Sequence, residues 1–147
     1  MEALPSRDRS STGSVLPGLF PKTVRSLNPE ERAFLRRVCA VVEGHLDEEE
    51  LSVATLAERL YVSRSALHRR MRSLIGRPPT WLVMEIRLRR SAELLRSEPC
   101  SVTEVSYAVG FRDLGHFSRR FKTRFGVSPS VFRRGEPDAT HGQRNAT

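Results

Sequence analysis

Two stretches that repeat one another decide the fold: SVATLAERLYVSRSALHRRMRSLIGRPPTW (residues 52–81) and SVTEVSYAVGFRDLGHFSRRFKTRFGVSPSV (residues 101–131). In their first halves equivalent residues lie 49 positions apart, as Ser52 and Ser101 do. In their second halves the offset is 50, as for Arg69 and Arg119, so the second copy has one extra residue in between. A repeat of this length predicts one supersecondary unit that occurs twice.

Each copy has the signals of a short helix, a tight turn and a longer helix. Ser52 and Ser101 are suitable N-caps, and Glu104 completes a capping box in the second copy. The longer helices should end at Gly76 and Gly126, because glycine favours the left-handed conformation that ends many helices. This is the helix-turn-helix layout. We therefore predict two such units, over residues 52–76 and 101–126.

Apolar residues at helical spacing are expected to hold each pair of helices together. In the first copy they are Leu56, Ala57, Leu60, Val62, Leu67, Met71 and Leu74. In the second they are Val105, Ala108, Val109, Phe111, Phe117, Phe121 and Phe125. The stripe of phenylalanines at 117, 121 and 125 is expected in the core, not as a base-stacking platform.

A linker helix is expected between the copies, over residues 79–98. Pro79 suits its first turn, and Pro99 lies just beyond its end. Its buried face is marked by Leu82, Ile86 and Leu95, with Leu88 and Ala92 beside it. The expected architecture is all-α and homeodomain-like, with about seven helices and one DNA-binding domain over residues 51–134.

The flanking segments are expected to be a leading helix and two tails. Asn28 as N-cap, Pro29 and Glu31 predict the start of a helix. This helix and an acidic linker, ending at Glu50, fill residues 28–50. Residues 1–27, rich in Ser, Pro and Gly, and the tail 135–147 are expected to be disordered.

The charge distribution favours a polyanionic partner. The net charge is +8, and Leu51–Arg134 carries 17 basic and six acidic side chains. Arginine supplies 23 of the 25 basic residues, and guanidinium groups suit phosphates and guanine edges.

Several classes of protein are disfavoured by what the sequence lacks. Cys39 and Cys100 have no metal-ligand or CxxC spacing, which favours free thiols in a reducing cytosol. There is no apolar run of membrane-spanning length and no secretory signal core. No metal cluster, phosphate-binding loop or nucleophile–base pair appears, so we expect no cofactor and no enzymatic activity.

The longer helix of each copy would enter the major groove of DNA. The face opposite the core predicts base contacts by Ser65, His68 and Arg69 in the first copy and by Gly115, His116 and Arg119 in the second. The alternatives are that the arginines bind only phosphate and that the histidines are ordinary surface residues. The predicted phosphate contacts are Arg64, Arg72, Arg112, Arg120 and Lys122.

The second copy also resembles the C-terminal signature of the AraC/XylS family of transcription regulators. The matching residues are Gly110–Phe111, Phe117–Ser118–Arg119, Phe121–Lys122, Phe125–Gly126 and Ser128–Pro129. Ile86–Arg87–Leu88, Ala92 and Leu94–Leu95 are similar to the family's linker helix. The resemblance implies a seven-helix domain that reads two successive major grooves and regulates transcription, more often as an activator.

Further expectations follow from this resemblance. The family's base-contact positions fall on Ser65, His68, Arg69, His116 and Arg119. Duplex DNA is then the partner, RNA polymerase a second candidate, and the chain a monomer in the cytoplasm, at the nucleoid. Residues 28–50 resemble the segment ahead of the output domains of hybrid two-component sensors.

Three residues depart from the family pattern. Tyr61 stands where the second copy, like the family, has glycine at Gly110. Pro78 replaces a capping serine such as Ser128, and Gly115 weakens its helix by about 1 kcal/mol against alanine.

Two other classes of function remain open. One is an architectural protein that binds DNA by charge alone, with little sequence preference. The other is an adaptor that docks a protein partner through its acidic leading segment. Arginines at matched places in the two copies favour sequence-specific binding over the architectural role, and the adaptor role could accompany DNA binding.

Overall fold

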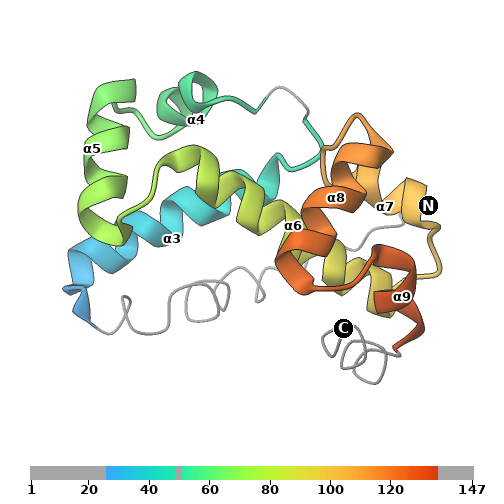
Figure 1. Cartoon of the computed structure of the whole chain (residues 1–147). Coiled ribbons are helices and arrows are strands. Elements are labelled where there is room, and N and C mark those ends of the chain that lie inside the picture. Colours follow the sequence, from blue (N-terminus) through green and yellow to red (C-terminus); the bar gives the residue numbers. More distant parts are fainter. Residues whose placement is uncertain (1–25, 49–50, 136–147) are drawn as a thin grey trace. The chain divides into compact units, whose positions relative to one another are not determined.

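The computed structural model describes residues 26–48 and 51–135, and in these ranges the chain forms seven helices, α3 to α9, with no strand (Figure 1). The all-α fold predicted from the repeat is confirmed. The two segments expected to be disordered lie mostly outside the described residues. Of these segments the structure describes only Ser26, Leu27 and Gly135; Leu27 is buried and Gly135 caps the last helix.

The described residues form two compact units. The first contains α3, α4, α5 and the start of α6, up to Val83. The second contains residues 46–48, the rest of α6 from Met84, and α7 to α9. The leading helix is therefore part of the first unit, and α6 is continuous through both.

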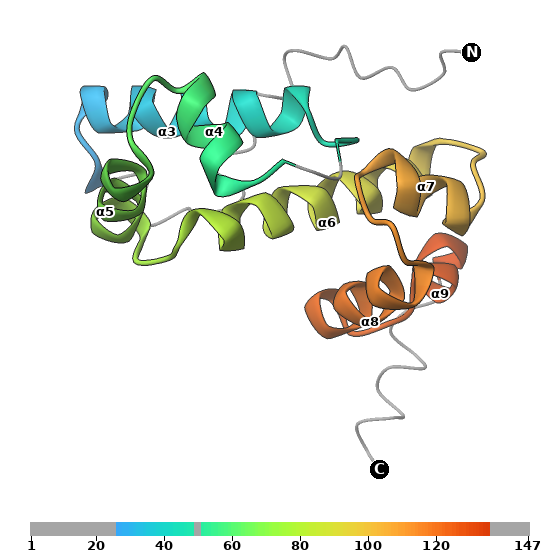
Figure 2. The ribbon, with the colours of Figure 1, turned by 90° about the horizontal axis from the view of Figure 1, so that it is seen from above.

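In the first unit the predicted caps of α3 and α4 and the predicted end of α5 are confirmed, and the structure adds Ser63 as the cap of α5. α3 (Pro29–Gly44) has the expected capping box of Asn28 and Glu31. α4 (Val53–Arg59) is capped by Ser52, and α5 (Arg64–Ile75) by Ser63. Gly76 ends α5 in the left-handed conformation, as predicted. α4 packs against both α3 and α5, and in the view of Figure 2 it crosses α3.

The cores of both units are the predicted apolar stripes, except that Val62, Ala108 and Phe125 are only half-buried. The largest fully buried side chains of the first unit are Leu35, Val38, Val42, Leu56, Leu60, Leu67, Met71 and Leu82. In the second unit Phe117 and Phe121 are fully buried. Phe125 is only half-buried, because it lies where α8 meets α9 and packs at the edge of the aromatic cluster, against Phe121 and Phe132.

The second unit follows the same helix signals. α7 (Val102–Ala108) has the expected Ser101–Glu104 capping box. α8 (Leu114–Phe125) is capped by Asp113 and ends at the left-handed Gly126. α9 (Pro129–Arg134) is capped by Ser128, whose side chain accepts a hydrogen bond from Val131 N.

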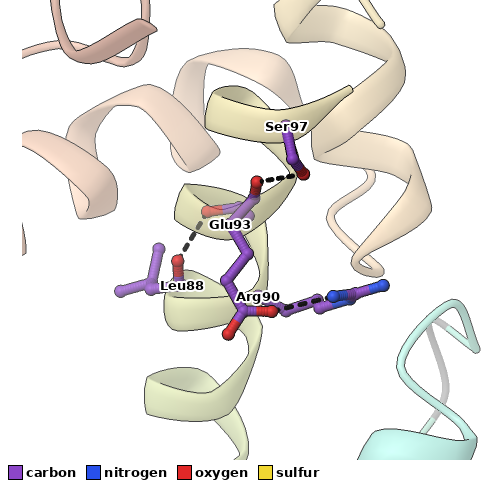
Figure 3. Close-up of polar contacts among 5 residues, drawn as sticks. Leu88, Arg90, Glu93 and Ser97 are labelled. Carbon is purple, nitrogen blue, oxygen red and sulfur yellow. Dashed lines mark hydrogen bonds and ion pairs between the residues drawn. The ribbon is translucent and has the colours of Figure 1, made fainter. Parts of the chain in front are cut away.

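The linker helix α6 (Pro79–Ser97) is buried more fully than its apolar pattern predicts. All five expected apolar residues are buried, and so are Glu85, Arg87 and Ser91. The Ser91 hydroxyl donates to Leu88 O at 2.7 Å within the helix, so burying it leaves no unmet donor (Figure 3). Two further contacts in the same view, Arg90 with Glu93 and Ser97 with Glu93 O, hold the later turns of α6 together.

The repeat extends further than the sequence comparison indicated, because α3 and α6 also correspond at an offset of 50. Pro29, Pro79 and Pro129 stand at the first positions of α3, α6 and α9. Arg37 of α3 and its equivalent, Arg87 of α6, each donate a hydrogen bond to a carbonyl at the turn that follows the short helix. Each copy is therefore a unit of three helices, not two.

The two turns share a backbone conformation but not an environment. Tyr61 has φ 60° and its equivalent Gly110 has φ 95°. A Cβ on Gly110 would lie 2.2 Å from Leu46 O and 2.9 Å from Cζ of Arg87. In the second unit, therefore, only glycine allows the chain before α4 to pack on the turn.

One ion pair fixes α8 to α6. Nε and Nη2 of Arg124 both lie 2.7 Å from Oε2 of Glu85, a carboxylate whose side chain is 8% exposed. In the first unit the equivalent positions hold two buried leucines, Leu35 and Leu74. The two copies thus place different chemistry, an ion pair and two buried leucines, at equivalent positions.

Gly110→Ala should be far more destabilising than Gly76→Ala. Both positions have positive φ, which costs an alanine about 1 kcal/mol, but nothing lies within 4 Å of a Cβ at Gly76. The clash at Gly110 should raise the total cost to about 3 kcal/mol. Urea unfolding measures the free energy of unfolding of the two variants. Equal losses of this free energy would show that Leu46 does not pack on this turn in solution.

Removing one member of the Glu85–Arg124 pair should lower the free energy of unfolding more than replacing both members by leucine. Glu85→Ala should cost about 1–3 kcal/mol, below the range for fully buried pairs because Arg124 is 38% exposed. The double change to leucine copies the first unit and should recover most of that loss. A double-mutant cycle by urea unfolding tests this, and a double variant less stable than either single one would contradict it.

Candidate nucleic-acid interface

α5 has one buried face and one exposed face that carries the predicted contacts. Leu67 and Met71 are fully buried. The side chains predicted to approach DNA, on the exposed positions of the same helix, are Arg64, Ser65, His68, Arg69 and Arg72. This division follows from helical spacing, since residues three and four apart share a face.

The arginines of this surface are available to an outside partner. Within the described ranges, no hydrogen bond or ion pair occupies the guanidinium of Arg64, Arg69 or Arg72. By contrast, Arg70 on the same helix has its Cζ 3.9 Å from the centroid of the Phe34 ring. α5 therefore uses one arginine for packing and leaves the others in solvent.

α8 is arranged in the same way. Phe117 and Phe121 are buried. All the predicted contact residues of this copy are exposed, namely Arg112, Gly115, His116, Arg119, Arg120 and Lys122. The structure thus brings together the residues assigned to each copy on one helix, with Arg112 in the turn just before α8.

Gly115 leaves room for the side chain of Arg119. A Cβ on Gly115 would lie 3.4 Å from Nη1 of Arg119 and 3.3 Å from Oδ1 of Asp113. The Asp113 carboxylate accepts a hydrogen bond from Gly115 N at 2.9 Å. The Arg119 guanidinium therefore lies along α8 toward its N-terminal turn, the end that faces the bases in a helix-turn-helix.

His116 is more constrained than an ordinary surface histidine. Its ring packs edge to face on the buried Phe111, with centroids 5.5 Å apart and planes at 79°. One side of the imidazole is thereby fixed while the residue as a whole remains exposed. Sequence spacing did not reveal this contact, because Phe111 precedes α8 by a turn.

Two buried groups, the thiol of Cys39 and the guanidinium of Arg87, are structural rather than part of this surface. Burial, aided by Glu43, raises the pKa of the Cys39 thiol to about 12, so this thiol is not reactive in the folded chain. Burial also lowers the pKa of the Arg87 guanidinium. The apolar spacing of the leading helix predicts the burial of Cys39, whereas no apolar pattern predicts the burial of Arg87.

Two other features are absent from the described part of the chain. Among these residues no group of three His, Cys, Asp or Glu side chains is placed to hold a metal ion. None of the described helices has the length and apolarity needed to cross a membrane.

The chain is similar to curated regulators over part of their length. The transcriptional activator RhaS of Escherichia fergusonii is 35% identical over 103 residues, which cover 70% of this chain and 37% of RhaS. Histidine kinase P4 of Formosa agariphila is 29% identical over 110 residues, 75% of this chain and 8% of the kinase. The chain thus spans well under half the length of these relatives.

Solved structures and a family model agree with this likeness. A transcriptional regulator with an AraC-type DNA-binding domain from Chromobacterium violaceum superposes with a TM-score of 0.67 at 28% identity, covering 76% of this chain and all of that one. The DNA-binding domain of AdpA, solved with a target DNA, gives 0.63 at 36% identity, covering 69% and 90%. A family model described as a helix-turn-helix domain matches residues 56–135. The chain belongs to the AraC-type family of helix-turn-helix DNA-binding domains, which are found in transcription regulators and are not enzymes.

Proposed function

We propose that this chain binds promoter DNA as a monomer and reads two successive major grooves, one with α5 and one with α8. The observation that carries the proposal is the pair Arg69 and Arg119. They occupy equivalent positions on the two helices, and both are exposed and without an ion pair among the described residues. Two matched arginines on two matched helices are what a two-headed reader of DNA requires.

Each helix would make base contacts from its N-terminal half. Arg69 and Arg119 would each form a bidentate contact with O6 and N7 of a guanine. Ser65 and His68 on α5, and His116 on α8, can donate or accept at neighbouring base edges. Gly115 would contribute by letting the Arg119 guanidinium reach the groove.

The remaining basic residues would bind the DNA backbone. These are Arg64, Arg72, Arg112, Arg120 and Lys122. Phosphate contacts of this kind fix the register of the protein on the duplex but carry no sequence information. They also make affinity fall steeply as salt rises, because each neutralised phosphate releases counterions.

The biological role follows from the family. RhaS, one of the relatives, is named as a transcriptional activator. We infer activation, with RNA polymerase as a candidate partner and the nucleoid in the cytoplasm as the place of action. An architectural role is the second candidate, and the net charge of +8 is the observation that favours it.

Selection of bound sequences from a random duplex pool should enrich one asymmetric motif. It should contain two blocks about 10 base pairs apart, because two recognition helices on one face of DNA are one helical turn apart. The selection is run at about 150 mM salt, since affinity depends on ionic strength. Salt-sensitive binding without any enriched motif would instead favour the architectural role.

Arg69→Ala and Arg119→Ala should each weaken binding to the selected site by about 1–3 kcal/mol and relax preference at one base pair. Arg72→Ala is the matched control, because a lost phosphate contact weakens all duplexes alike and lowers the salt slope by about 0.9. Fluorescence anisotropy on the selected and a scrambled duplex separates the two patterns. If the Arg69 and Arg119 variants lose the same amount of affinity for the selected duplex and for the scrambled one, these residues bind only phosphate.

A further inference from the structure

Tyr61 is an anomaly in the turn between α4 and α5. Its φ of 60° makes it the one non-glycine residue with positive φ in the described ranges. Its side chain is 91% exposed, the highest value among the large hydrophobic residues that the structure exposes. No ring contact or hydrogen bond joins that side chain to the described residues.

The second unit shows why a side chain is possible here at all. The equivalent residue, Gly110, has its Cβ position filled by Leu46 O and by the guanidinium of Arg87. In the first unit the equivalent arginine, Arg37, bonds to Leu60 O at 3.4 Å and leaves the turn open. Tyr61 therefore projects into solvent from a place where the other unit is covered.

The side chain does nothing for the fold that would offset its strain. A left-handed conformation costs a residue with a Cβ free energy that a glycine would not lose. A strained residue without internal contacts at such a site is a reason to look for a function outside the fold. The inference therefore concerns what Tyr61 meets when a partner is bound.

The residues near Tyr61 favour an anionic partner. It lies two residues before Ser63, the N-cap of α5, and three before the exposed Arg64 at the start of that helix. The charged residues within three positions of Tyr61 along the chain are Glu58, Arg59 and Arg64, and Arg37 of α3 bonds to Leu60 O. Three of these four residues are basic. This charge balance fits a phosphate better than a basic or neutral protein surface.

We propose that the Tyr61 hydroxyl donates a hydrogen bond to a DNA phosphate beside the groove that α5 enters. The proposal rests on the DNA-binding function proposed above and adds a residue to it. Because tyrosine is neutral, the contact strengthens binding and fixes register without releasing counterions. It therefore has a signature that an arginine contact lacks.

Two variants of Tyr61 and one control test the proposal. Tyr61→Phe removes only the hydroxyl, and Tyr61→Gly removes the side chain and the strain. Tyr107→Phe is the matched control, because Tyr107 is also exposed but lies on α7. Affinity for the selected and the scrambled duplex is measured over a range of salt, together with the melting temperature.

Both Tyr61 variants should bind both duplexes about two- to tenfold more weakly than the parent, with an unchanged salt slope. The glycine variant should melt no lower than the parent, which excludes loss of folding as the cause. Tyr107→Phe should bind like the parent. If the parent protein does not bind DNA, the proposed function fails. If the parent binds and the Tyr61 variants bind equally well, only the phosphate contact is overturned. Binding of a protein partner is then the remaining role for this side chain.

Discussion

The buried guanidinium of Arg87 is the contact on which the second unit depends. It donates to Glu48 O at 3.0 Å and to Gly110 O at 3.5 Å, and so joins the chain before α4, the linker helix α6 and the turn before α8. This arrangement needs glycine at 110, because any Cβ would collide with Leu46 O and with Arg87 itself. The orientation of α8, and with it the place of Arg119, therefore depends on a polar contact in the interior of the unit. An arginine serves here because its fork of donors reaches two carbonyls at once.

The same three-helix plan is stabilised differently in the first unit. Arg37, the equivalent of Arg87, is exposed and makes one bond to the turn. Leu35 and Leu74 are buried where the second unit has Glu85 and Arg124. At these positions the first unit relies on apolar packing, which tolerates side-chain exchanges of similar volume. The second unit relies on paired polar groups, and removing one partner of such a pair lowers the free energy of unfolding strongly. The strained Tyr61 is tolerated only in the first unit, because its turn is uncovered.

The sequence predicts the helices well because their boundaries depend on local chemistry. Asn28, Ser52 and Ser101 act as caps, and Gly76 and Gly126 end helices, as expected. The exposed faces of α5 and α8 follow from helical spacing alone.

The buried polar residues of α6 could not be predicted, since apolar periodicity assigns Glu85 and Arg87 to the surface. The correspondence of α3 with α6 was hidden for a related reason: few of their residues are identical, and Glu85 replaces a leucine. The contact of His116 with Phe111 and the position of the Arg119 guanidinium over Gly115 depend on three-dimensional packing, which a linear pattern does not contain.

The differences between the two reading surfaces bear on the proposed mode of binding. Ser65 of α5 corresponds to Gly115 of α8, and His116 corresponds to an alanine, Ala66. Two helices with unlike side chains at equivalent places would prefer unlike base sequences, so a monomer would recognise an asymmetric site without a symmetric partner. Either recognition helix alone would bind DNA weakly. Because α6 runs through both units as one helix, binding of one recognition helix raises the effective concentration of the other near the DNA. Under the proposed function, specificity thus comes from the divergence of the two copies, and affinity comes from the covalent link that keeps them together.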